Sequence, residues 1–191
     1  MMTTARLFVA ALGLAAAGAQ AAVAEGTMVA GVELPGAIEV EAHRLVLNGA
    51  ALRKVAFIKI YVAGLYLENK ESQPETILNT DGARTLMMHF LRDVDAAKLC
   101  EGWDNSLSQN TPNPSDALKA QFQTLCSWMV DAEQGERLKF VYSPGQGTSV
   151  EYAGKVKGPM PGKEFADALF RTWLGPKSIP GEEFKKHLLG G

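Results

Sequence analysis

Three charged residues, Arg53, Lys54 and Lys59, lie within an otherwise apolar stretch that runs from residue 48 to residue 68. A guanidinium keeps its charge, so in apolar surroundings Arg53 must be paired or must line a cavity. A cavity with apolar walls and one cationic end would suit an amphipathic anion, whose carboxylate would lie on the guanidinium. The alternative is that Arg53 points to solvent near a turn, where an arginine is ordinary.

Other chemical motifs are missing from the sequence. It contains no Gly-x-Ser-x-Gly elbow, no phosphate-binding loop and no His-Glu-x-x-His pair. The three histidines, His43, His89 and His187, are scattered, and the two cysteines match no metal-site spacing, so we predict no metal and no cofactor. With 19 basic and 21 acidic residues, a net charge of −2 and no basic block, the chain is not expected to bind nucleic acid.

The first 24 residues have the pattern of a cleavable signal peptide. Arg6 supplies one positive charge, and the apolar stretch Leu7–Ala19 is too short to cross a bilayer as a stable helix. Small residues at the −3 and −1 positions would permit cleavage after Ala21 or after Ala24. We therefore expect a periplasmic or secreted protein whose mature chain, about residues 25–191, forms one domain without stable membrane insertion.

The order of the predicted elements indicates an α+β fold. An entry strand and a hairpin are expected within 31–48, with Asn48-Gly49 as a strong turn signal. Residues 48–68 should form one long strand or two joined by a bend, and another strand should span 84–91. Residues 71–81 could hold one helical turn, and longer helices are expected at 95–109, from Ser115 to Gly135, at 163–174 and at 182–189. Strands at 138–142 and 148–152 should form a hairpin with a five-residue loop. Because strands and helices are segregated, we predict an antiparallel sheet covered on one face by helices.

Cys100 and Cys126 are candidates for a disulfide. The helices on either side of residues 111–114 should pack antiparallel, and the two cysteines lie at similar distances from that turn. They could then face each other at one level, which makes a bridge geometrically plausible. An exported compartment permits disulfides, whereas the alternative is a pair of buried free thiols.

The segment around Arg53 resembles the chalcone isomerase superfamily, in particular its bacterial chalcone isomerase-like branch. In that family a Gly-x-Gly-x-Arg turn precedes a strand that ends in Gly-Val-Tyr-Leu-Glu, and this sequence has Gly49-Ala-Ala-Leu-Arg53 followed by Gly64-Leu-Tyr-Leu-Glu68. Arg171-Thr-Trp-Leu-Gly175 also resembles the family's C-terminal segment. The resemblance implies a large antiparallel sheet with one layer of helices, an open-faced sandwich, and a ligand cleft between the two layers.

The resemblance also implies roles for single residues. Chalcone isomerases close a flavanone ring with the help of an arginine, whereas related members of the fold bind fatty acids with this arginine on the carboxylate. Arg53 corresponds to that arginine and Thr172 to a substrate-contacting threonine, whereas Tyr61 stands where a strand threonine is expected. The Tyr-Ser pair that should open the first long helix is replaced by Val94-Asp-Ala-Ala97. This loss favours binding over catalysis.

Three hypotheses follow. The first is a non-catalytic protein that binds a small amphipathic anion, such as a fatty or aromatic acid, through Arg53, Tyr61 and Thr172. The second is an isomerase or intramolecular lyase in which Arg53 is catalytic and stabilises a developing enolate or phenolate. The third is a periplasmic interaction protein without a ligand, in which Arg53 pairs with an internal acid.

Overall fold

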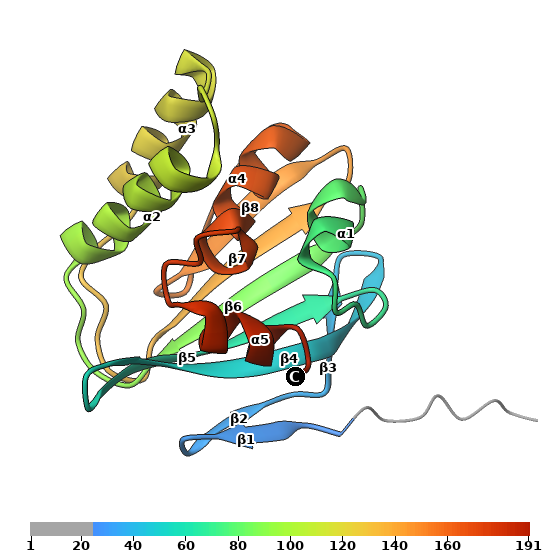
Figure 1. Ribbon diagram of the computed structural model, residues 1–191, viewed down its shortest axis with the longest axis vertical. Coiled ribbons are helices and arrows are strands. Elements are labelled where there is room, and N and C mark those ends of the chain that lie inside the picture. Colours follow the sequence, from blue (N-terminus) through green and yellow to red (C-terminus); the bar gives the residue numbers. More distant parts are fainter. Residues whose placement is uncertain (1–24) are drawn as a thin grey trace, which may run out of the picture.

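A computed structural model describes residues 25–191, and the predicted signal peptide, residues 1–24, lies outside the described residues. The main element is a seven-stranded antiparallel sheet whose strands follow one another in chain order from β3 to β9 (Figure 1). Its strands are β3 (Ala37–Val40), β4 (His43–Val55), β5 (Ile58–Leu67), β6 (Arg84–Phe90), β7 (Arg137–Ser143), β8 (Gly147–Tyr152) and β9 (Lys155–Met160).

Five helices lie on one face of this sheet (Figure 1). They are α1 (Pro74–Asn79), α2 (Ala96–Asn110), α3 (Asp116–Ser127), α4 (Lys163–Leu174) and α5 (Glu182–Leu188). Phe165, Leu169 and Trp173 recur at helical spacing on α4 and are all buried in the main core. The helix α2 packs beside α4, and α3 contacts both α2 and α4. The predicted α+β class, with helices covering one face of an antiparallel sheet, is confirmed.

The opposite face of the sheet carries a smaller cover that the sequence analysis did not include. A separate two-stranded hairpin, β1 (Thr27–Val29) and β2 (Val32–Leu34), lies below β4 and β5 in Figure 1. Side chains of β5 divide between the two faces, because successive residues of a strand point in opposite directions. Leu65 joins the helix side, and Tyr66 joins a second core with Leu34 of the hairpin.

The predicted turn at Asn48-Gly49 is wrong, because both residues lie inside β4 at an irregularity in its pairing with β5. The buried Asn48 side chain donates to the carbonyl oxygens of Glu71 (3.0 Å) and Leu188 (2.9 Å). A Cβ at Gly49 would lie 2.2 Å from the carbonyl oxygen of His187. Both residue types thus allow the close approach of α5 to β4. The chain instead turns at residues 56–57, so the predicted stretch 48–68 is divided between two strands, β4 and β5.

Two element boundaries and one additional strand differ from the sequence prediction. Ser143 pairs with Gly147, so the β7–β8 loop spans residues 144–146 and is shorter than expected. The helix α3 ends at Ser127 rather than near Gly135, because the chain next forms an extended bridge in which Ala132 pairs with Val94. The strand β9 was not predicted, since it is an exposed edge strand that contains Gly158-Pro159 and lacks apolar alternation.

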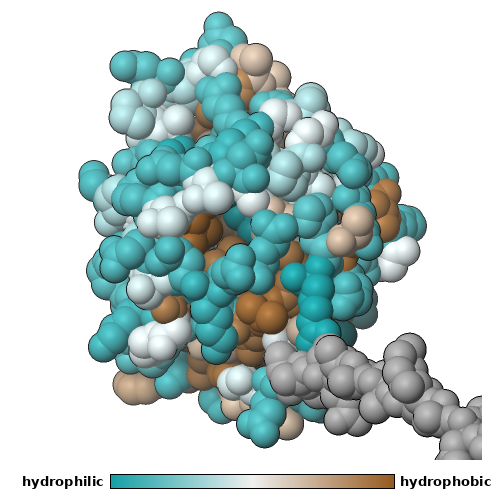
Figure 2. Space-filling view, turned by 90° about the vertical axis from the view of Figure 1, so that its right-hand side faces the viewer, coloured by the Kyte–Doolittle hydropathy of each residue, from teal (hydrophilic) through white to brown (hydrophobic). Residues whose placement is uncertain are grey.

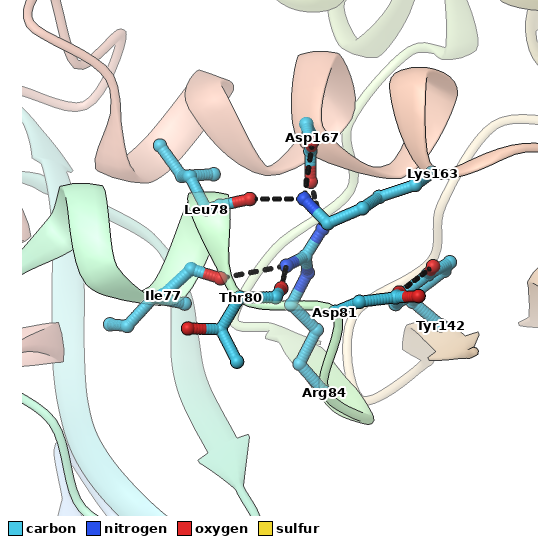
Figure 3. Close-up of polar contacts among 8 residues, drawn as sticks. All are labelled: Ile77, Leu78, Thr80, Asp81, Arg84, Tyr142, Lys163 and Asp167. Atoms are coloured by element: carbon cyan, nitrogen blue, oxygen red, sulfur yellow. Dashed lines mark hydrogen bonds and ion pairs between the residues drawn. The ribbon is translucent and has the colours of Figure 1, made fainter.

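A network of polar contacts, here called the Arg84 cluster, joins β6, α1 and α4 (Figure 3). Arg84 Nη2 forms an ion pair with Asp167, and Nη1 donates to the carbonyl oxygen of Ile77 at 2.8 Å. Lys163 Nζ lies 2.7 Å from the second carboxylate oxygen of Asp167. The Arg84 guanidinium also lies over the Tyr142 ring, 4.8 Å from its centroid. This cluster fastens the helix layer to the sheet.

Both hydrophilic and apolar side chains lie on the outer surface of the domain (Figure 2). On the side that faces the viewer in Figure 2, apolar surface in the middle is framed by hydrophilic side chains. No helix of residues 25–191 is long and apolar enough to span a membrane.

Candidate ligand-binding site

A cavity of about 610 Å³ lies between the sheet and the helices, near the turn that joins β4 to β5. This volume lies within the roughly 300–1,000 Å³ of small-molecule sites. The sheet contributes Arg53, Val55, Ile58, Ile60, Tyr61 and Met88, and the helices contribute Lys98, Leu99, Gly102, Trp103, Thr172 and Trp173, while loops add Arg92 to Asp95, Ile179 and Pro180. Arg53, Tyr61 and Thr172, which the sequence analysis selected, therefore all line one cavity.

Arg53 supplies the cationic part of the lining. It is half-buried on β4, where it pairs across the strands with Tyr61 of β5. Its Nη1 donates a hydrogen bond of 2.8 Å to the carbonyl oxygen of Pro180, which fixes the side chain. Within residues 25–191 no carboxylate forms an ion pair with Arg53. The site thus holds a positioned guanidinium whose charge an anionic ligand could neutralise.

Tyr61 adds a hydroxyl next to this guanidinium. Its ring makes edge contacts with Phe90 and Phe184, at centroid distances of 6.3 Å and 5.8 Å. Burial raises the pKa of Tyr61 to about 12, although the hydrogen bond from Trp173 and the charge of Arg53 act in the opposite direction. The Tyr61 oxygen accepts a hydrogen bond of 3.3 Å from Trp173 Nε1. Tyr61 is therefore neutral near pH 7, and its O–H can be donated to a ligand oxygen.

Thr172 lies on α4 and is only 4% exposed. Its Oγ1 is one of the buried side-chain atoms without a hydrogen-bond partner among the described residues, and none of the others belongs to a residue that lines this cavity. A buried hydroxyl without a partner costs about 1–3 kcal/mol. A ligand oxygen that approached Thr172 would remove part of that cost.

The walls of the cavity are mainly apolar, and the sequence analysis assigned several of them no role in binding. Met88 comes from β6, Leu99 and Trp103 come from α2, and Trp173 lies beside Thr172. The Trp103 ring packs edge-on against Phe140 at a centroid distance of 5.6 Å, so it is held in the core. Because such residues at helical spacing usually form a core, the sequence offered no signal that they also face a cavity.

Cys100 and Cys126 are joined in a disulfide with a Cα–Cα distance of 5.6 Å, within the ordinary range of such bridges. Cys100 lies on α2 between the cavity residues Lys98 and Gly102, and Cys126 lies on α3. The bridge therefore fastens α3 to the turn of α2 that forms one cavity wall. Among residues 25–191 no group of three or more metal-ligating side chains could hold a metal ion.

Comparison with known families agrees with this architecture. A model of the family described as chalcone isomerase-like matches residues 26–190. The chain belongs to the chalcone isomerase-like family. No curated protein sequence shows a significant match to this chain.

Among solved structures, the chalcone isomerase-like chain is similar to the crystal structure of the Arabidopsis thaliana fatty-acid binding protein AtFAP1. The TM-score is 0.69 over 86% of this chain and 96% of the other, with 16% sequence identity. At this low identity the similarity establishes a shared fold. Val94 and Asp95, the positions at which the family resemblance led us to expect a Tyr-Ser pair, both line the cavity.

Proposed function

We propose that this chalcone isomerase-like protein binds a small amphipathic anion, such as a fatty acid, without transforming it. The carboxylate would accept hydrogen bonds from Arg53 and from the Tyr61 hydroxyl, and the apolar part would lie along Met88, Leu99 and Trp103. The observation that carries this proposal is a positioned, half-buried Arg53 at the edge of an apolar cavity, with no carboxylate partner among the described residues. The fold shared with AtFAP1, which is named a fatty-acid binding protein, supports it.

Two features argue against the alternatives. An isomerase of the chalcone type would need hydroxyl groups at the start of α2, where the cavity is lined by Val94 and Asp95. An interaction protein without a ligand would need Arg53 to pair with an internal acid, and no such pair occurs within residues 25–191. Binding needs only the cation and the apolar walls that are present.

We further propose that the protein acts in the periplasm or outside the cell. The support is the signal-peptide pattern of residues 1–24. Intact-mass measurement of the protein from the exported fraction tests it, because cleavage after Ala21 or Ala24 predicts a mature chain that starts at residue 22 or 25. A full-length chain retained in the cytoplasm would contradict export.

The binding proposal is tested by native mass spectrometry and lipid extraction of the protein purified without added lipid. We expect a bound acyl ligand in the wild type and its loss in Arg53→Ala. Arg137→Ala is the matched control, because Arg137 lies on β7 of the same sheet, is exposed and does not line the cavity. If the wild type neither carries an acyl ligand nor binds added palmitate, the proposal is wrong. An absorbance assay with chalcones tests the isomerase alternative, which predicts a rate above background that Arg53→Ala abolishes.

A further inference from the structure

The tip of the β4–β5 hairpin, residues 54–59, exposes an unusual concentration of apolar surface. Phe57 is 99% exposed, Val55 53% and Ile58 49%. These are three of the six large apolar residues that are exposed among the described residues, and they lie within four consecutive positions. Scattered exposed apolar residues are normal, whereas a contiguous group commonly marks a binding surface.

The turn itself does not require these side chains. Ala56 has a φ of 51° and occupies the left-handed region, where glycine or asparagine is preferred in two-residue hairpins. An aromatic residue at the next position contributes nothing to such a turn, and the 99% exposed Phe57 makes almost no contact with the other residues of 25–191. A solvent-exposed Phe57 therefore calls for an explanation outside the fold of this chain.

The charges on the hairpin tip itself are positive and form no ion pair with another described residue, whereas acidic residues lie beside the tip on the cavity lining. Lys54 and Lys59 lie directly opposite each other in the β4–β5 pairing and both are exposed. Like charges at such positions repel each other. Within residues 25–191 neither lysine forms an ion pair, and the same holds for the exposed Arg92 near by. Asp93 and Asp95 lie on the same cavity lining, and Asp93 accepts a hydrogen bond from the backbone N–H of Gln134.

We propose that the hairpin tip docks the protein on an anionic lipid surface. Apolar and aromatic side chains that enter the interfacial region, together with lysines that meet anionic headgroups, are the combination that holds proteins reversibly on bilayers. The hairpin tip lies next to the cavity, because Val55 and Ile58 belong both to the tip and to the cavity lining. In Figure 1 the β4–β5 turn projects from the end of the sheet. Docking by the tip would bring the cavity opening to the lipid surface.

This inference goes beyond the proposed function and does not depend on it, because docking requires the tip and not an occupied cavity. If the cavity binds an acyl chain, docking lets the chain pass between bilayer and cavity without crossing water. A tip that instead joins two copies of this chain would give a dimer in solution. The two arrangements differ in their partner and can be separated by experiment.

The test is co-flotation of the purified protein with vesicles of phosphatidylglycerol and phosphatidylcholine. The N-terminus of the protein is first determined by mass spectrometry. We expect binding at least about tenfold tighter than to pure phosphatidylcholine, weakening as salt is raised. Phe57→Asp and the double variant Lys54→Glu/Lys59→Glu should each lower binding by about tenfold or more. Val156→Asp is the matched control, since Val156 is 71% exposed on β9 and does not belong to the tip.

Circular dichroism and thermal unfolding should show that Phe57→Asp folds like the wild type, because the side chain is fully exposed. No binding to the mixed vesicles, or equal binding by Phe57→Asp and wild type, would overturn the proposal. A dimer in light scattering that Phe57→Asp converts to a monomer, without vesicle binding by the wild type, would also overturn it. Ligand extraction from the wild type is a separate measurement, so the failure of one proposal leaves the other standing.

Discussion

Two arginines on the same sheet, Arg53 of β4 and Arg84 of β6, have opposite surroundings. Arg84 is 1% exposed and is held by Asp167, by backbone carbonyls and by the ring of Tyr142 (Figure 3). Arg53 is half-buried and donates to one carbonyl oxygen, that of Pro180. A buried guanidinium requires partners. Among residues 25–191 Arg84 has an acidic partner, whereas Arg53 has none. The comparison separates a structural arginine from one available to a ligand.

The largest effect is expected from Arg84→Met, which removes the charge and keeps much of the side-chain volume. Asp167 would keep only Lys163 as an ion-pair partner, and the carbonyl of Ile77 would lose its donor. Removing one partner of a buried ion pair costs about 3–5 kcal/mol, so we expect a loss of unfolding free energy of about 4 kcal/mol, the middle of that range. Denaturant unfolding measures it, and Asp167→Asn supplies the second arm of a double-mutant cycle. A loss below about 1 kcal/mol would show that the Arg84 cluster is not structural.

Removal of the disulfide should give the next largest loss of stability. The disulfide lies next to the cavity that Arg53 lines. It closes a loop of 26 residues and fastens the α2 wall of the cavity. The relation between loop length and chain entropy gives about 3.5 kcal/mol of stability for a loop of this size. We expect Cys100→Ser/Cys126→Ser to lower unfolding free energy by that amount and to weaken ligand binding, since Lys98 and Gly102 flank the bridge in the cavity wall. Unchanged unfolding of the double variant, or two free thiols in the unfolded wild type, would contradict it.

Arg53→Ala should show the reverse of the Arg84 variant. Stability should change by less than about 1 kcal/mol, because Arg53 is half-buried and makes one hydrogen bond. Binding of an acyl anion should weaken by about 1.5–3 kcal/mol, the value of hydrogen bonds to charged groups. Isothermal titration with a soluble fatty acid measures the second quantity and urea unfolding the first. Equal losses of stability in the Arg53 and Arg84 variants would end the distinction between the two arginines.

The sequence predicted some of this arrangement and could not predict the rest. The segment 163–174 shows a helical apolar period, and α4 occupies these residues. The position of Arg53 in an apolar strand, combined with the family resemblance, led to three residues that line one cavity. The same argument from charge applies to Arg84, but its main partner, Asp167, is 83 residues away. Sequence alone therefore could not tell a paired arginine from an unpaired one.

Asn48-Gly49 illustrates the same limit for local structure. The pair is typical of a turn, yet here both residues contact α5 from the far end of the chain. The Asn48 side chain donates a hydrogen bond to the Leu188 carbonyl, and Gly49 leaves room for the backbone of α5 because it has no Cβ. A local pattern predicts structure well when local forces decide, as in α4. It fails where a tertiary contact uses the same residue types for another purpose. The candidate site depends on such contacts, since the hydrogen bond between Arg53 and Pro180 joins residues 127 positions apart.

The smallest predicted effect concerns the Thr172 hydroxyl, which either contacts a ligand, as we propose for Arg53, or only supports the fold, as Arg84 does. Its Oγ1 is buried and has no partner among the described residues. Thr172→Val replaces this group with a methyl of similar size, so the ligand-free protein should be more stable by about 1 kcal/mol, the lower end of the cost of an unpaired buried hydroxyl. If the hydroxyl meets the ligand, binding should weaken by about 0.5–1.5 kcal/mol, the net value of a neutral hydrogen bond. Unfolding and titration of the same variant separate the two. A variant that loses stability and binds as the wild type does would show that Thr172 belongs with Arg84, as part of the structure, rather than with Arg53.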